Sequence, residues 1–262
     1  MGNIILSNSF IDVTDANITA RTSTTGYPKI AVMDRWNLKR RFRANDVTAN
    51  DYLLKFDFTT AKAVLGIFLN DVNFNQVKIE GNATDSWGTP SFPGTTLTVS
   101  QNKVTGRYQI YIPLTGFNLR WLRLFIPVTA TAVGGYTSKW EIGTVCFLSA
   151  VTTLSHNISY GYGQSARHFF NTSATERIKT AEALRWEGSL SFDNRSKDHE
   201  SDLWALGKMD MSKPFVFYEN RDVTNEAYLC VRDDSMSVTE FAYSGVSGST
   251  IKIKEVYMLG EN

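Results

Sequence analysis

The densest group of chemically versatile side chains in this sequence lies in residues 35–43. It alternates five cations with two aromatic rings and runs Arg-Trp-Asn-Leu-Lys-Arg-Arg-Phe-Arg. Guanidinium groups bind phosphate oxygens or stack on flat rings, and a tryptophan can stack on a base or a sugar. We therefore take four residues of this segment as ligand or interface candidates: Trp36, Arg40, Arg41 and Arg43.

A structural role is the alternative for the same segment. Its two aromatic rings would pack inward, and its cations would meet a neighbouring subunit or the carboxylates of Asp34, Asp46 and Asp51. The formal net charge of the whole chain is only +1, so no wider basic surface is expected around the segment. This balance favours the structural role and argues against nucleic acid as a partner.

Trp87 is the fifth candidate, because it lies in a loop-like stretch rich in glycine and proline, Ser-Trp-Gly-Thr-Pro-Ser-Phe-Pro-Gly at residues 86–94. An exposed tryptophan on such a loop suits stacking on a sugar or burial at a protein interface. The same ring could instead close one end of a β-sandwich.

The remaining reactive residue types do not form a recognisable active site. The three histidines, His156, His168 and His199, form no metal-binding or nucleophile-base pair. Cys146 and Cys230 lie in apolar, strand-like runs without metal-ligand spacing, which predicts buried free thiols. We predict no catalytic residue, no metal site and no cofactor, and hence a protein that is not an enzyme.

Length and composition allow two domains of ordinary size. The chain has 262 residues, 42% of them hydrophobic, which is enough for each domain to bury its own core. No run approaches the 18 or so apolar residues of a membrane span. The first residues lack the basic and apolar segments of a signal peptide, so we expect synthesis in a cytoplasm.

Alternation with a period of two dominates the first part of the chain. Residues 52, 54, 56 and 58 (Tyr, Leu, Phe, Phe) share one face of a strand, and Val64 to Leu69 predicts a strand buried on both faces. A long strand is expected from Leu119 to Val128, with Arg120 and Arg123 on opposite faces. Short strands separated by turn residues predict an antiparallel β-sandwich over residues 1–149.

A second domain is expected over residues 150–262, after the apolar rhythm lapses at residues 149–153. One helix is predicted at about residues 197–206, capped by Ser196 and closed by Gly207. The strands predicted around it span residues 181–192, 214–218, 227–231, 237–241 and 251–259. The fold class is therefore mainly β, with a C-terminal β-barrel or sandwich and one α-helix.

The first domain resembles the discoidin, or coagulation factor 5/8 type C, branch of the galactose-binding-like jelly rolls. Leu119 to Leu124 resembles a characteristic Arg-Tyr-Leu-Arg strand of that family, and Trp140 to Gly143 its closing strand. Tyr27 to Asp34, Tyr52 to Phe58 and Ala63 to Phe68 complete the likeness in order. The family's cysteine pair is absent, and Asp34-Arg35 replaces its Asp-Gly, so no ligand-binding residue is carried over.

The second domain resembles, more weakly, the β-barrel-plus-helix units of bacteriophage tail tube and tail tip proteins. Trp186 to Phe192, the predicted helix and Lys213 to Phe217 follow the order of elements in those units. The resemblance implies rings built by contacts between identical subunits.

Three hypotheses for the function follow. The first is a structural protein of a bacteriophage virion, in the tail or tail tip, with copies of itself and other virion proteins as partners. The alternative is a carbohydrate-binding module that recognises host-surface glycans. A third, a glycoside hydrolase fragment, requires two carboxylates about 5–9 Å apart in a cleft.

Overall fold

The computed structural model describes residues 3–7, 9–36, 40–103, 105–134, 137–155, 157–170, 177–196, 213–218, 223–232, 238–241 and 245–256. The protein is mainly β, as predicted, and the strands in these ranges pair antiparallel in three sheets. The helix expected at residues 197–206 lies outside the described residues, as do His156 and His199.

Two of the sheets form the predicted β-sandwich. The five-stranded sheet has the order β3 (Ile18–Ala20), β5 (Asp51–Ala63), β11 (Asn118–Ile126), β7 (Gln76–Asn82), β8 (Thr96–Thr98). The six-stranded sheet has the order β2 (Phe10–Ile11), β12 (Glu141–Leu148), β6 (Gly66–Val72), β10 (Tyr108–Pro113), β9 (Ser100–Gln101), and β4 (Phe42–Arg43) also pairs with β12. Two short 3-10 helices, η1 (Asp15–Asn17) and η2 (Lys29–Met33), lie in the connections.

The core of the sandwich lies between these sheets. Leu54, Phe56 and Phe58 of β5 point into it, as predicted for that strand, but Tyr52 does not share their face. Leu53 lies in the core instead, and Tyr52 lies beneath Lys55 on the outer face, because the pairing of β5 with β11 is irregular between Leu124 and Phe125. Phe147 of β12 packs edge-on against Phe56 and Phe58, with ring centroids 4.8 and 5.2 Å away. Trp140 is also buried there, and its indole N–H donates to the carbonyl of Thr48 over 2.9 Å.

One predicted strand was given the wrong side-chain orientation. Arg120 and Arg123 of β11 both bind carboxylates on the outer face of the five-stranded sheet, Asp57 and Glu80. The pairing of β11 with β5 is irregular between Leu119 and Trp121, and such a bulge changes the direction in which the following side chains point. Strict alternation therefore fails at Arg120.

The third sheet has eight strands. Its path is β13 (Thr152–Ser155), β1 (Asn3–Ser7), β16 (Phe215–Tyr218), β17 (Ala227–Arg232), β19 (Gly245–Glu255), β15 (Arg177–Ser196), β14 (Asn157–Phe170), and β18 (Val238–Phe241) pairs with β19. The path runs from β13 at one end to β14 at the other, so these strands form an open sheet. Because β1 belongs to it, the sheet draws on both ends of the chain, while the division at residue 149 stays a prediction.

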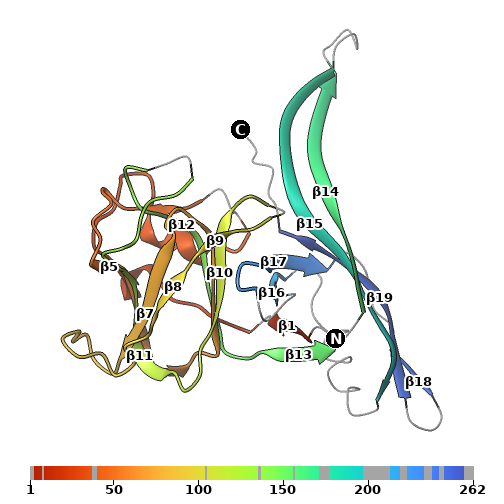
Figure 1. Ribbon diagram of the computed structural model, residues 1–262, viewed down its shortest axis with the longest axis horizontal. Helices are drawn as coiled ribbons and strands as arrows, with labels where there is room; N and C mark the ends of the chain where they lie inside the picture. The colour runs from red at the N-terminus through yellow and green to blue at the C-terminus, as the bar shows by residue number, and fades with distance from the viewer. Residues whose placement is uncertain are drawn as a thin grey trace.

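The part of the eight-stranded sheet around β16 and β17 lies against the outer face of the six-stranded sheet (Figure 1). Phe68, Tyr111 and Leu148 from the sandwich share an apolar cluster with residues of β16 and β17, and the rings of Tyr111 and Tyr218 lie 4.6 Å apart. Phe68 faces this cluster while Ile67 and Leu69 face the sandwich core. The prediction of a strand buried on both faces is thereby confirmed.

A long hairpin extends the third sheet away from the sandwich. β14 and β15 pair with each other from Asn157↔Ser191 to Phe170↔Arg177. β19 pairs only with residues 187–196 of β15, so in the described part of the chain residues 177–186 pair with β14 alone. Figure 1 shows this two-stranded arm reaching well beyond the other strands.

Candidate binding cleft

A cleft of about 380 Å³ opens at one end of the sandwich. It forms where β4, the end of β6, the β9–β10 turn and the β11–β12 connection converge on the start of β12. Its lining residues are Arg41, Arg43, Asp71, Val72, Asn73, Gln101, Gly106, Arg107, Tyr108, Val133, Gly134 and Glu141.

Arg41 stands at the centre of the charged wall. One guanidinium nitrogen donates to Asp71 over 2.9 Å, and another donates to Glu141 over 3.0 Å. Burial by itself would lower the pKa of Arg41, but the attraction of Asp71 and the hydrogen bond to Glu141 outweigh it and raise that pKa. The cation is therefore held in place between two carboxylates.

Arg43 completes the network from the neighbouring strand β4. Its Nε donates to the second carboxylate oxygen of Glu141, whose side chain is only 5% exposed. The guanidinium carbon of Arg43 also lies 3.9 Å from the centre of the Tyr27 ring, a cation–π contact. Glu141 is thus a buried carboxylate shared by two arginines.

The backbone conformation around Asp71 fixes the position of its carboxylate in the cleft. Asp71 has a φ of 54°, in the left-handed region that Asp and Asn tolerate better than most residues. Opposite it, a Cβ at Gly143 would lie 2.9 Å from the carbonyl oxygen of Asn70, so only glycine fits without a shift. Asn73 ties the rim together, since its amide donates to the Lys139 carbonyl over 2.6 Å and accepts from the Glu141 N–H over 2.6 Å.

These groups suit a polar ligand without net charge. The cations of the lining, Arg41, Arg43 and Arg107, are balanced by carboxylates, because Arg107 pairs with Glu255 of β19 over 2.7 Å. The lining also supplies the amide of Gln101 and the ring of Tyr108. Donors, acceptors and one flat ring can together hold a ligand rich in hydroxyl groups.

The five candidate residues do not form one site. Arg41 and Arg43 meet in the cleft, whereas Arg40 is 69% exposed and its guanidinium lies 4.0 Å from Asp34. Trp36 is 41% exposed and lines a different hollow, together with Phe10 and Pro214. Phe42 packs inward as the structural alternative expected, but Asp46 and Asp51 pair with Arg21.

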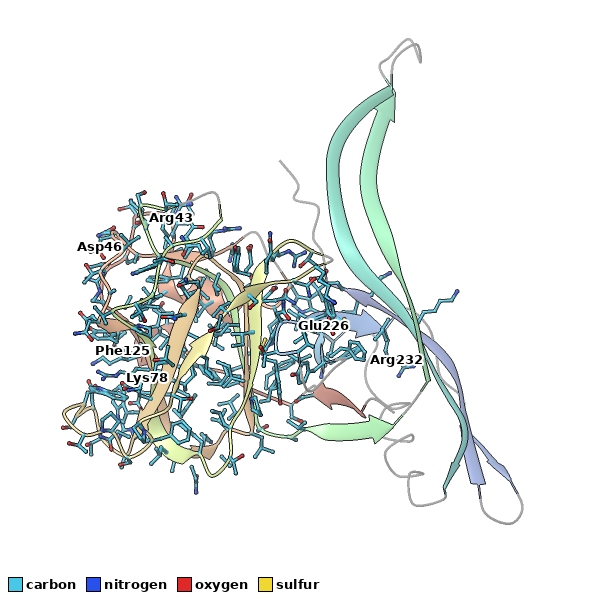
Figure 2. All side chains as sticks on the ribbon, in the orientation of Figure 1. Arg43, Asp46, Lys78, Phe125, Glu226 and Arg232 are labelled. Atoms are coloured by element: carbon cyan, nitrogen blue, oxygen red, sulfur yellow. The ribbon has the colours of Figure 1, made fainter. Side chains whose placement is uncertain are left out.

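Trp87 lies apart from the cleft, against the outer face of the five-stranded sheet. It follows β7, whereas Asn73 of the cleft precedes that strand. Its indole N–H donates to Asp85, and the guanidinium of Arg123 lies 4.5 Å from its ring centre. Figure 2 shows Arg43 and Asp46 at one end of the sandwich, and Phe125 and Lys78 farther along it. A ligand or interface role for the five residues stays a prediction.

The cleft also contains residues that the sequence patterns did not single out, chiefly Asp71, Asn73, Arg107 and Glu141. The one available signal was Glu141, an acidic residue within the apolar Trp-Glu-Ile-Gly run, since a carboxylate at the start of a buried strand needs a cation nearby. In the described ranges, no group of three or more His, Cys, Asp or Glu side chains forms a metal-ligand set. No helix in those ranges has the length and apolar character needed to cross a membrane.

No protein-family model and no curated protein matches this chain. Solved structures with a similar sandwich are a chitosan-binding module of a Paenibacillus chitosanase/glucanase (14% identity, TM-score 0.36, 54% of this chain and 97% of that one) and a family 32 carbohydrate-binding module of a Clostridium perfringens glycoside hydrolase (12%, 0.30, 50% and 92%). A third is the lectin domain of lectinolysin complexed with Lewis B antigen (9%, 0.31, 51% and 92%). All three are carbohydrate-binding modules, and none of the three is a tail protein.

Proposed function

We propose that this protein is a non-enzymatic structural protein that assembles with copies of itself through the β14–β15 arm. The setting we propose is a bacteriophage virion, in the tail or tail tip, with other virion proteins as further partners. The observation that carries the proposal is the two-stranded part of the arm, residues 162–170 and 177–186.

A two-stranded ribbon of this kind is marginally stable by itself in water. β14 is also a terminal strand of its sheet, so one side of its backbone has no strand partner among the described residues. A long unpaired edge is a template for pairing with another chain. A second copy supplies a matching arm, and repeated contacts of one kind between identical subunits close into a ring.

Rigid attachment of the sandwich supports the same proposal. Besides the apolar cluster, polar contacts bind the two parts: Asn102 donates to the Asn225 carbonyl over 2.8 Å, and Asn225 donates back to the Gln101 carbonyl over 2.7 Å. Lys103 and Glu226 lie 3.2 Å apart beside them, and Figure 2 shows Glu226 at this junction. In a ring, every sandwich would therefore have the same fixed orientation.

The test is the mass of the purified full chain by native mass spectrometry, with electron microscopy of the same sample. We expect a ring of defined copy number, and a monomer at high protein concentration would refute the proposal.

Two proline variants sharpen this test. Neighbouring residues of an edge strand direct their N–H groups alternately toward the partner strand and toward the open edge, so Gln164→Pro and Ser165→Pro remove one group of each kind. The variant that loses the outward N–H should keep its melting temperature and lose assembly. If both variants assemble as the wild type does, strand pairing at β14 is not the contact.

A second candidate function is glycan binding by the sandwich. The cleft around Arg41 favours it, because its balanced charges, its mixture of donors and acceptors and the Tyr108 ring suit a neutral sugar. The two functions are compatible, since an assembled ring would present many copies of the cleft.

A glycan array with the full chain tests this candidate. Asp71→Asn keeps the side-chain size and the left-handed backbone but removes a charge from the cleft, so binding should fall at least tenfold. Asp85→Asn, beside Trp87 and outside the cleft, is the matched control and should leave binding unchanged. Absence of binding across the array, or equal binding by both variants, would exclude this use of the cleft.

A further inference from the structure

A second cavity opens at the side of the sandwich, between the β7–β8 loop and β10. Its volume is about 300 Å³, and it lies apart from the polar cleft. None of its lining residues has a charged side chain. They are Ile79, Phe92, Gly94, Thr95, Leu97, Ile110, Tyr111, Ile112, Pro113, Leu114 and Thr224. Thr224 belongs to the connection before β17, so both parts of the molecule contribute to the cavity.

The walls of this cavity are fixed before any ligand arrives. Ile79, Ile110 and Ile112 of its lining are buried side chains of the sandwich core. The loop wall is anchored by backbone hydrogen bonds of 2.9 Å in both directions between Phe92 and Gly81. Gly94 has a φ of 57°, and a Cβ there would collide with the Ile79 carbonyl oxygen, so the loop lies directly against β7.

The edge of β10 beside the cavity is closed to an added peptide strand. β9 pairs only with Tyr108 and Gln109, so residues 110–113 border the cavity directly. The N–H of Tyr111 already donates to the Thr224 carbonyl over 2.8 Å, and Pro113 has no N–H to offer. Main-chain pairing, on which strand addition depends, is therefore blocked.

A charged group is also excluded from the interior. No lining residue can neutralise it, and burying an unpaired charge among apolar side chains is strongly unfavourable. The polar groups of the lining side chains are hydroxyls, those of Thr95, Tyr111 and Thr224. A volume of this size is at the lower end of the range for small-molecule sites, and preformed apolar cavities take up apolar molecules.

We propose that this cavity binds a small, uncharged, apolar molecule, such as an aromatic ring system or a hydrocarbon chain, independently of the polar cleft and of assembly. A single hydroxyl or carbonyl on the ligand would meet the threonine hydroxyls at the mouth. Any charged end of the ligand would remain in solvent.

The experiment uses the neutral fluorescent probe N-phenyl-1-naphthylamine with the purified full chain. Binding should give a saturable rise in fluorescence that n-decanol reverses by competition. Thr95→Trp fills the cavity from its rim, and we expect at least tenfold weaker binding. Thr96→Trp is the matched control, because Thr96 is exposed and is not part of the lining, and it should bind the probe as the wild type does.

Thr224→Trp gives the same test from the opposite wall and keeps the proposal testable if Thr95→Trp fails to fold. Absence of saturable binding by the wild type would overturn the proposal. Equal binding by Thr95→Trp, Thr224→Trp and Thr96→Trp, each with a wild-type melting curve, would also overturn it.

Discussion

The two outer faces of the sandwich carry similar aromatic side chains under different covers. On the five-stranded sheet, Tyr52, Trp121 and Phe125 each lie beneath a cation, with Lys55, Arg120 and Arg123 at 4.9, 5.5 and 5.0 Å from the respective ring centres. On the six-stranded sheet, Phe68 and Tyr111 lie beneath a second sheet. Long cationic side chains can shield a ring while their charge stays in water, so only the second face needs a protein cover.

The two outer faces differ in whether they carry cations. Arg120 holds Asp57 with two hydrogen bonds of 2.7 and 2.6 Å, and Arg123 holds Glu80 at 2.5 Å. Along β6 and β12 the residues that face outward include Phe68, Cys146 and Leu148, with no cation among them. In this protein, the strand with aromatic and cationic side chains on its outer face is exposed to solvent there. The strands without cations on that face are covered by another sheet.

The largest expected difference between the faces concerns their aromatic rings. Phe68→Ala should lower the free energy of unfolding by about 3–5 kcal/mol, because it opens a cavity in a fully buried layer. Phe125→Ala, on the half-exposed face, should cost only about 1 kcal/mol. Urea unfolding followed by tryptophan fluorescence and circular dichroism measures both. Similar losses for the two variants would contradict the distinction between a covered face and a solvent face.

The ion pairs should differ in the same direction by a smaller amount. Arg107→Met removes the cation that lies 2.7 Å from the buried carboxylate of Glu255, which should cost roughly 2–4 kcal/mol. Arg120→Met removes an exposed partner of Asp57. It should shift the melting temperature less than half as much as Arg107→Met does. If Arg120→Met has the larger effect, ion pairing matters more on the solvent face than between the layers.

The smallest expected effect is a loss of stability in acid, caused by protonation of Asp57 on the solvent face. The hydrogen bonds from Arg120, opposed by partial burial, lower the pKa of Asp57 below its ordinary value of 3.8. A carboxyl with a lowered pKa in the folded state stabilises the protein above the unfolded value and loses that contribution as the pH falls through the folded value. The melting temperature should therefore decrease as the pH is lowered beneath about 4.

Asp57→Asn should reduce the fall in melting temperature between pH 5 and pH 2 without abolishing it. Burial would raise the pKa values of Asp46 and Asp85, but hydrogen bonds, chiefly those from Arg21 and Lys55 respectively, outweigh it and lower both values. Melting curves recorded across this pH range for the wild type and the variant provide the measurement. An identical pH dependence for both proteins would remove Asp57 from the explanation.

Local patterns could predict the sandwich strands because their burial alternates over a few residues. The doubly buried β6 and the thiols followed from apolar runs: Cys146 and Cys230 are free and buried, and burial raises the pKa of Cys146 to about 12. The arm was harder to predict, because its strands have no regular apolar period. The strand expected at residues 181–192 extends over residues 177–196, and β14 continues to Phe170 through a polar stretch.

The cleft illustrates the limit for a site. Arg41 and Arg43 attracted attention because cations cluster in one short segment. Glu141 lies 100 residues from Arg41 in sequence, and Asp71 reaches it through a left-handed backbone conformation. Pairings over such distances depend on sheet order, which residue types along a single strand do not determine.

The pairing of β1 with β13 brings the two ends of the sandwich segment together. Leu6 lies opposite Thr152 and Asn3 opposite Ser155, so the chain leaves the eight-stranded sheet and returns to it on neighbouring strands. Everything between these strands is an excursion whose two ends lie side by side, the arrangement that tolerates insertion and exchange of whole modules. Another fold could therefore take the place of the sandwich in the chain, provided that it covers the apolar side chains of β16 and β17.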